Sequence, residues 1–250
     1  MKIITYSIIL ITLLLSNPVK AQMILDIESG AVFNGYNDVR IPGDLGTSFS
    51  LTDDLKSEPA IFLRLRASYK IKVRHTISLL YAPLTTKSEG RVGKDILFND
   101  DLFDANTLLN GTYKFNSYRL TYRYDIVNNP KLIFGLGFTA KIRDASIGLS
   151  SEGKTSVKTN VGFVPIINFR LWWKPTEKFG ILLDGDALAA PQGRAEDIQL
   201  AATYAISDNL GIRAGYRILE GGADNGEVFN FSLFHYASVG LTYTFKKKKE

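Results

Sequence analysis

A regular alternation of apolar and polar residues over Phe229 to Phe245 constrains the fold of this chain more than any other feature. Counting back in twos from Phe245 gives a mostly apolar row that begins with Tyr243 and Leu241, whereas the other parity is mostly small or polar. Successive side chains of a β-strand point to opposite faces, so the stretch predicts one long strand with one apolar face. Its length and its terminal aromatic residue are typical of a strand in a membrane β-barrel.

The same alternation recurs upstream and predicts an all-β fold, a closed antiparallel up-and-down transmembrane β-barrel over residues 22–245. We expect about ten strands, with eight or twelve as alternative counts. The other nine expected strands are residues 23–36, 59–71, 74–91, 110–126, 132–149, 161–174, 179–190, 196–206 and 210–220.

The connections alternate between longer and shorter ones, which places both termini on the periplasmic side, where the turns of such barrels stay short. The longer ones include the polar stretches 37–57, 92–109 and 150–160. Within the expected strand 132–149, the apolar parity changes after Arg143, which predicts a β-bulge near the rim.

Aromatic residues of the apolar parity gather beside the short turns. Rings at one height are typical of the aromatic girdle where a barrel meets the membrane surface. The expected girdle consists of Tyr69, Tyr124, Trp173, Phe179, Tyr204, Tyr243 and Phe245.

The amino terminus carries Lys2, an apolar run and a small-x-small pattern ending at Ala21, which together predict a secretory signal peptide over residues 1–21. An uncleaved anchor helix is the alternative. The chain has no cysteine, so it is neither a lipoprotein nor a disulfide-linked protein. Without Lys2 and Lys20, 28 of the 30 basic residues remain against 25 acidic ones, and Lys246 to Lys249 belong to an expected basic periplasmic tail, residues 246–250. No basic patch interleaved with aromatic residues suggests nucleic-acid binding.

The parity opposite the apolar rows carries many charged residues, which a membrane barrel directs into its lumen. Unpaired buried charges are costly, so we expect carboxylates and guanidinium groups to pair across the lumen and fill it. The alternative is an open pore that favours anions. The expected lumen charge cluster consists of Arg64, Arg66, Arg119, Arg123, Asp184, Asp186, Arg213 and Arg217.

Few residues are candidates for catalysis or metal binding. Asp184 and Asp186 lie two residues apart on one parity, where they could share a proton or a metal ion, but they are more simply partners of the arginines. The two histidines, His75 and His235, have no metal-ligand neighbour at a useful spacing. We therefore expect no catalytic residue, no metal and no cofactor.

The signal, the strands and the closing HYASVGLTYTF resemble small Gram-negative outer-membrane β-barrel proteins, and the Ala-Gln cleavage site is similar to those of exported Bacteroidota proteins. This resemblance implies an outer-membrane location, with membrane lipid and the barrel-assembly machinery as partners. Such barrels usually end on the aromatic residue that this machinery recognises, whereas Lys246 to Glu250 extend past Phe245 here.

Two enzyme families share this general build, but their motifs are missing. Omptin proteases have an Asp-x-His pair, and here Val73 and Leu233 stand two residues before the histidines. Lipid A deacylases have a His-x-Ser motif, and Ala237 stands two residues after His235. The sequence thus favours a non-enzymatic, structural or surface-interaction barrel with a largely plugged lumen. The alternatives are a porin-like channel for small anions, a lipid-modifying enzyme and a soluble lipocalin-like barrel.

Overall fold

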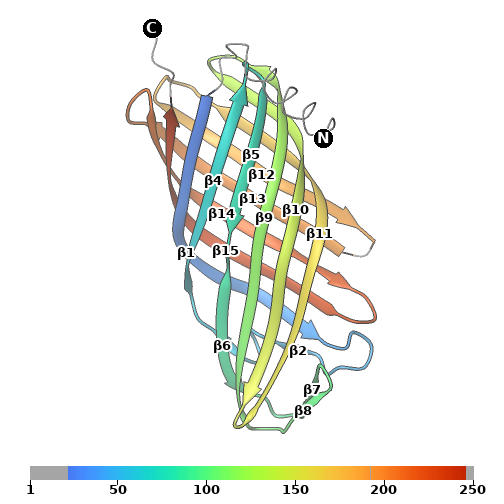
Figure 1. Ribbon diagram of the computed structural model, residues 1–250. Helices are drawn as coiled ribbons and strands as arrows, with labels where there is room; N and C mark the ends of the chain where they lie inside the picture. The colour runs from blue at the N-terminus through green and yellow to red at the C-terminus, as the bar shows by residue number, and fades with distance from the viewer. Residues whose placement is uncertain (1–21, 192, 246–250) are drawn as a thin grey trace, which may run out of the picture.

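The computed structural model describes residues 22–191 and 193–245, which form a closed antiparallel barrel of ten wall strands (Figure 1). The predicted all-β barrel and its strand number are thereby confirmed. The predicted signal peptide and basic tail lie outside the described residues. Around the barrel, the wall consists of β1 (Gln22–Arg40), β4 (Ala60–Ile71), β5 (His75–Ala82) continued by β6 (Thr85–Arg91), β9 (Leu108–Asn128), β10 (Leu132–Ser151), β11 (Lys154–Trp173), β12 (Phe179–Ala190), β13 (Gly193–Ala205), β14 (Leu210–Asp224) and β15 (Phe229–Phe245).

The barrel closes between its first and last strands. Met23 of β1 lies opposite Phe245 of β15 on one side and opposite Tyr69 of β4 on the other. The β1–β15 register shifts once, between Asn34 and Tyr36. Both ends of the described chain therefore lie at the same end of the barrel, which we call the termini end; the opposite end is the loop end (Figure 1). In residues 22–191 and 193–245, no helix is long and apolar enough to cross a membrane.

The third wall strand is interrupted near its middle. Residues 74–91 were expected to form one strand, but β5 ends at Ala82 and β6 begins at Thr85, with Pro83 between them. Proline has no N–H to donate to a ladder, so it interrupts the pairing with β9. Both halves still pair with β9, and the barrel stays closed.

The change of parity in β10 does not come from a bulge, so that prediction is wrong. β10 pairs with β11 in unbroken register over its whole length, and its register with β9 is continuous beyond Gly135. The apolar residues beyond Arg143 instead face inward, and Ile147 and Leu149 are buried. They join an apolar core at the loop end, because apolar side chains outside a lipid environment are stabilised by facing the protein interior.

That core is built by the two long connections, which fold back into the barrel mouth. Residues 41–59 contain β2 (Phe49–Ser50) and β3 (Lys56–Ser57), and residues 92–107 contain the β7 (Ile96–Phe98) and β8 (Asp101–Phe103) hairpin. Phe49 and Phe98 meet edge to face, with ring centroids 5.9 Å apart. The prediction of a third long loop over residues 150–160 is wrong, because β10 and β11 continue through this stretch and leave only a two-residue turn.

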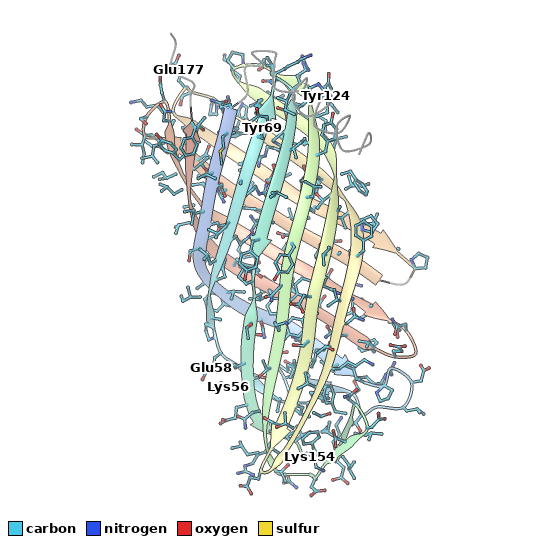
Figure 2. All side chains as sticks on the ribbon, in the orientation of Figure 1. Lys56, Glu58, Tyr69, Tyr124, Lys154 and Glu177 are labelled. Carbon is cyan, nitrogen blue, oxygen red and sulfur yellow. The ribbon has the colours of Figure 1, made fainter. Side chains whose placement is uncertain are left out.

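The residues of the expected girdle all point outward and are between 39% and 52% exposed. Register places several of them side by side at the termini end, where Phe179 lies opposite Tyr204 and Tyr243 lies opposite Leu210. Tyr69 and Tyr124 lie near that end in Figure 2, whereas Lys154 lies at the loop end. The outward wall therefore has the ring of aromatic side chains that membrane barrels place at a lipid–water boundary.

Candidate functional site

A layer of buried ion pairs crosses the lumen, with Asp197 of β13 near its centre. Asp197 pairs with Arg64 of β4 at 3.0 Å, with Arg119 of β9 at 2.6 Å, and with Arg217 of β14. The four residues come from four different strands, and each is at most 5% exposed. One carboxylate thus holds three guanidinium groups from different parts of the barrel wall.

Glu28 of β1 is the second shared carboxylate of this layer. It accepts hydrogen bonds from Arg217 Nε and Nη2 at 3.0 and 2.8 Å, and from Arg213 Nη2 at 2.9 Å. Gln199 of β13 donates to Glu28 at 3.0 Å and to Ser238 of β15 at 2.9 Å. The layer therefore also spans the closing seam between β1 and β15.

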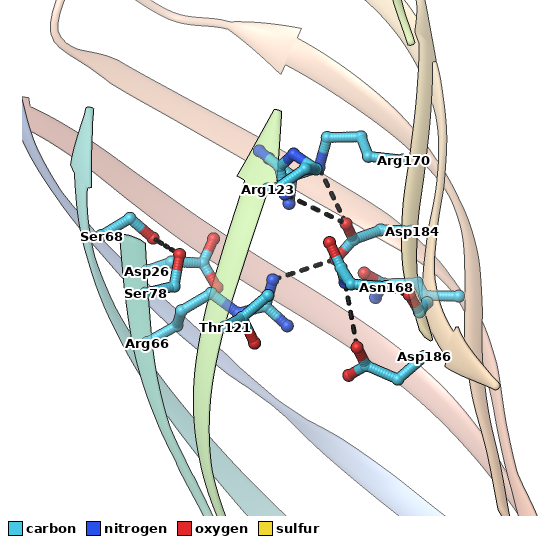
Figure 3. A network of polar contacts seen from close by, with 12 residues as sticks. Asp26, Arg66, Ser68, Ser78, Thr121, Arg123, Asn168, Arg170, Asp184 and Asp186 are labelled. Atoms are coloured by element: carbon cyan, nitrogen blue, oxygen red, sulfur yellow. Dashed lines mark hydrogen bonds and ion pairs between the residues drawn. The ribbon is translucent and has the colours of Figure 1, made fainter. Parts of the chain in front are cut away.

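Asp184 and Asp186, the two aspartates that could have formed a catalytic pair, both accept hydrogen bonds from neighbouring side chains (Figure 3). Asp184 accepts from Arg170 Nε at 2.8 Å through one oxygen and from Arg66 Nη1 at 3.1 Å through the other. Asp186 accepts from Arg119 at 2.6 Å through Oδ2, while Thr139 and Asn168 donate to its Oδ1 at 2.7 and 3.0 Å. Every oxygen of the pair thus has a partner inside the lumen, as expected of aspartates that pair with the arginines.

The structure places all eight residues of the expected cluster in the lumen, where they form two ion-paired groups. Asp197 and Glu28 link the group of Arg64, Arg119, Asp186, Arg213 and Arg217, and Asp184 links Arg66 and Arg123. Arg213 pairs with Asp26 and Glu28, and Arg123 with Asp125 and Asp184. Sequence reasoning left out Asp197, although it pairs with three arginines. The alternation in β13 could have identified Asp197, since Asp197 and Gln199 alternate with the outward Ile198 and Leu200.

Two cavities lie on opposite sides of the ion-paired layer and share no lining residue. The cavity toward the termini end has a volume of about 340 Å³, and Glu28, Arg64 and Arg217 contribute to its wall. The cavity toward the loop end has a volume of about 470 Å³ and includes Lys141, which lies opposite Arg119 on the neighbouring strand. The layer therefore lies between the two cavities.

Neither histidine lies in the lumen. His75 Nδ1 and the Tyr122 hydroxyl are 2.9 Å apart. His235 hydrogen-bonds the Tyr216 hydroxyl and lies over Gly35, where an added Cβ would stand 2.6 Å from its Nε2. Over the described part of the chain, no group of three or more His, Cys, Asp or Glu residues is placed to hold a metal ion. The irregularity in β1 beside Gly35 thus makes room for the His235 ring.

Gly137 of β10 lets the backbone of β9 approach closely, and this contact is its structural role. A Cβ on Gly137 would stand 2.1 Å from the Tyr122 carbonyl oxygen and 2.8 Å from the Arg123 Cα, and neither backbone atom can move away cheaply. We predict that Gly137→Ala destabilises the barrel by about 1–3 kcal/mol, measured by urea unfolding in vesicles. Gly211→Ala is the matched control, because its Cβ would have only one neighbour, at 3.6 Å. Equal losses in the two variants would contradict this role.

Comparison with family models and with curated proteins finds no match. Among solved structures, the chain is similar to the outer membrane protease OmpT from Escherichia coli, with a TM-score of 0.55 and 11% identity over 90% of this chain and 97% of that one. It is also similar to Ail, the attachment invasion locus protein of Yersinia pestis, with a TM-score of 0.42 and 12% identity over 89% and 99% of the two chains.

At this level of identity the comparison concerns the fold alone. It shows that the chain has the architecture of Gram-negative outer-membrane β-barrels, in agreement with the resemblance seen in the sequence. Activity has to be argued from the residues of this chain.

Proposed function

We propose that this protein is an integral outer-membrane β-barrel of non-enzymatic, structural or surface-interaction type, with a lumen closed by its own ion pairs. The membrane location is supported by outward apolar side chains along the wall strands, among them Leu120, Phe138 and Leu241, and by the aromatic residues at the termini end. Outer-membrane lipid and the barrel-assembly machinery are the partners that follow from this location.

The observation that carries the closed lumen is the ion-paired layer around Asp197 and Glu28. Its members are almost completely buried, and it separates two cavities that have no lining residue in common. A ten-stranded barrel is narrow, so arginine side chains from opposing walls can meet across it. The alternative of an anion channel requires a path through this layer.

Liposome swelling tests the closed lumen. We predict that wild-type protein admits small anions no faster than protein-free vesicles, whereas the double variant Arg119→Ala with Asp186→Ala admits them measurably, because it removes both partners of one ion pair from the layer. The matched control is Lys114→Ala with Asp144→Ala, which removes a half-exposed pair of 2.9 Å outside the lumen layer and is expected to change nothing. Rapid swelling with the wild-type barrel would refute the proposal and favour the channel.

A further inference from the structure

The barrel wall is incomplete between β11 and β12. These strands pair only from Trp173 opposite Ile181 to Ile167 opposite Ala187, whereas β11 pairs with β10 along its whole length. Among the described residues, positions 154–166 of β11 therefore have no strand partner on their second side. Figure 1 shows β12 ending far short of the tip of β11, with the two strands diverging toward the loop end. Near that tip the β7–β8 hairpin contacts β11, where Asn99 donates to the Val157 carbonyl at 3.4 Å.

The larger of the two cavities lies behind this opening. Val164 and Pro165 of β11 line it from one side of the opening, and Leu188 and Ala190 of β12 line it from the other. Its volume of about 470 Å³ falls within the range of roughly 300–1,000 Å³ that is usual for small-molecule sites. The lining is predominantly apolar and continues inward to the Phe115 ring. The cavity thus lies beneath the loops and also opens through the barrel wall between β11 and β12.

The mouth lies at the height where the outward apolar row of β11 ends. This row begins at Trp173 at the termini end and continues through Phe163 to Val161, which are 64% and 70% exposed. A tilted strand of about 9–11 residues crosses the hydrocarbon layer, and residues 163–173 provide such a crossing. The strand-free segment just above Ile167 therefore faces the half of the membrane nearer the loop end, which is the outer leaflet in the proposed location.

Lys141 gives the cavity a buried amino group that forms no direct ion pair among the described residues, although Asp186 and Asp197 interact with it electrostatically. Its side chain is 3% exposed and lines the cavity. Its ammonium lies 4.7 Å from the centre of the Phe115 ring, and it forms no ion pair with any carboxylate of the described chain. A buried charge is costly unless it is paired. The side chain therefore has room for a direct contact with an anion that enters the cavity.

Arg143 adds a second available cation two residues along the same strand. It lines the cavity, its Nε is buried without a hydrogen-bond partner, and its Nη2 donates to Asn160. Arg194, at the cavity rim, pairs instead with Glu220 at 2.6 Å, and these hydrogen bonds raise the pKa of Arg194 above its ordinary value. The unsatisfied charge thus gathers at Lys141 and Arg143.

We propose that this cavity binds a single-chain anionic amphiphile taken up from the outer leaflet. Its phosphate or carboxylate group contacts Lys141 and Arg143, and its alkyl chain lies against Phe115, Leu188 and Pro165 on the way to the β11–β12 opening. The apolar lining favours the alkyl chain, and the position of the mouth favours entry from the membrane. The buried Lys141 and the half-buried Arg143, neither of which has an ion pair within the described part of the chain, favour the anionic head group. The inference goes beyond the closed barrel proposed above, because the cavity lies on one side of the ion-paired layer and needs no passage through it.

Native mass spectrometry of the detergent-released barrel tests this site with palmitoyl lysophosphatidic acid as the probe. We expect one saturable adduct, with palmitoyl lysophosphatidylcholine binding at least tenfold more weakly because its head group has no net charge. The double variant Lys141→Met with Arg143→Gln is expected to weaken lysophosphatidic acid binding at least tenfold, while Lys141→Arg retains it. Heat-modifiable gel mobility verifies that each variant is folded.

A second variant and a competitor keep the test decisive. Ala145→Trp leaves both cations in place but fills the cavity that Ala145 lines, so it is expected to abolish the adduct. Equal binding of the two lysolipids, or wild-type binding by the charge-removed and filled variants, would overturn the proposal. Complete displacement by millimolar inorganic phosphate would show that a free anion, rather than a lipid, is recognised. Failure of the closed lumen would appear separately, as swelling of wild-type liposomes.

Discussion

Replacing Asp197 by alanine is expected to destabilise the barrel by about 3–5 kcal/mol, since removing one partner leaves a buried charge without compensation. Asp197 faces three guanidinium groups, those of Arg64, Arg119 and Arg217. Arg64 would be left with Glu28 at 3.9 Å as its nearest carboxylate, and the three positive charges would repel one another. Urea unfolding in vesicles, followed through Trp172 and Trp173, the only two tryptophans of the chain, measures this loss.

Two controls separate charge from shape. Glu227→Ala also removes a carboxylate from an ion pair, with Lys158 at 3.9 Å, but Glu227 is largely exposed, so we expect a loss of less than about 1 kcal/mol. Asp197→Asn keeps the volume and removes the charge, and it is expected to fall between wild type and Asp197→Ala. If Asp197→Ala were no more costly than Glu227→Ala, the ion-paired layer would not stabilise the fold.

The fold was accessible from sequence because each wall strand separates an apolar from a polar environment. That separation requires apolar and polar residues to alternate with a period of two in every strand. The row Tyr118, Leu120 and Tyr122 shows this alternation in β9. The same pattern placed Arg64, Arg119 and Asp184 in the lumen. It does not say which carboxylate faces which arginine, because that depends on the height of each residue around a closed wall. The parity of β13 does direct Asp197 inward, so its omission is an oversight rather than a limit of the pattern.

Three features could not be predicted from the apolar–polar alternation, each for a physical reason. Alternation shows which face is apolar but not whether the apolar face meets lipid or protein, so the inward Ile147 and Leu149 were attributed to a bulge. Polar residues between Ser150 and Asn160 suggested a loop, although outside the membrane a strand has no need of an apolar face. The opening between β11 and β12 depends on where pairing stops, at Ile167 opposite Ala187, and pairing length is set by the whole barrel rather than by either strand.

Introducing a charge on the outward face is expected to have a large and depth-dependent effect. Leu120 is 51% exposed and lies six residues from Ile126, about 20 Å along the strand, which places it near the middle of the outward apolar band. We predict that Leu120→Arg costs about 2–4 kcal/mol, the usual penalty for arginine at the bilayer midplane. Urea unfolding of the barrel in phosphatidylcholine vesicles measures it.

Ile126→Arg is the matched control on the same strand. Ile126 is 48% exposed on the same face, but it lies at the termini end, where its carbonyl accepts a hydrogen bond from Arg74 at 2.7 Å. An arginine there reaches water, so we expect a cost of about 0–1 kcal/mol. A water-surrounded barrel of lipocalin type would give two small and similar effects, because neither position would then face hydrocarbon. The difference between the two variants therefore decides whether lipid or water surrounds this wall.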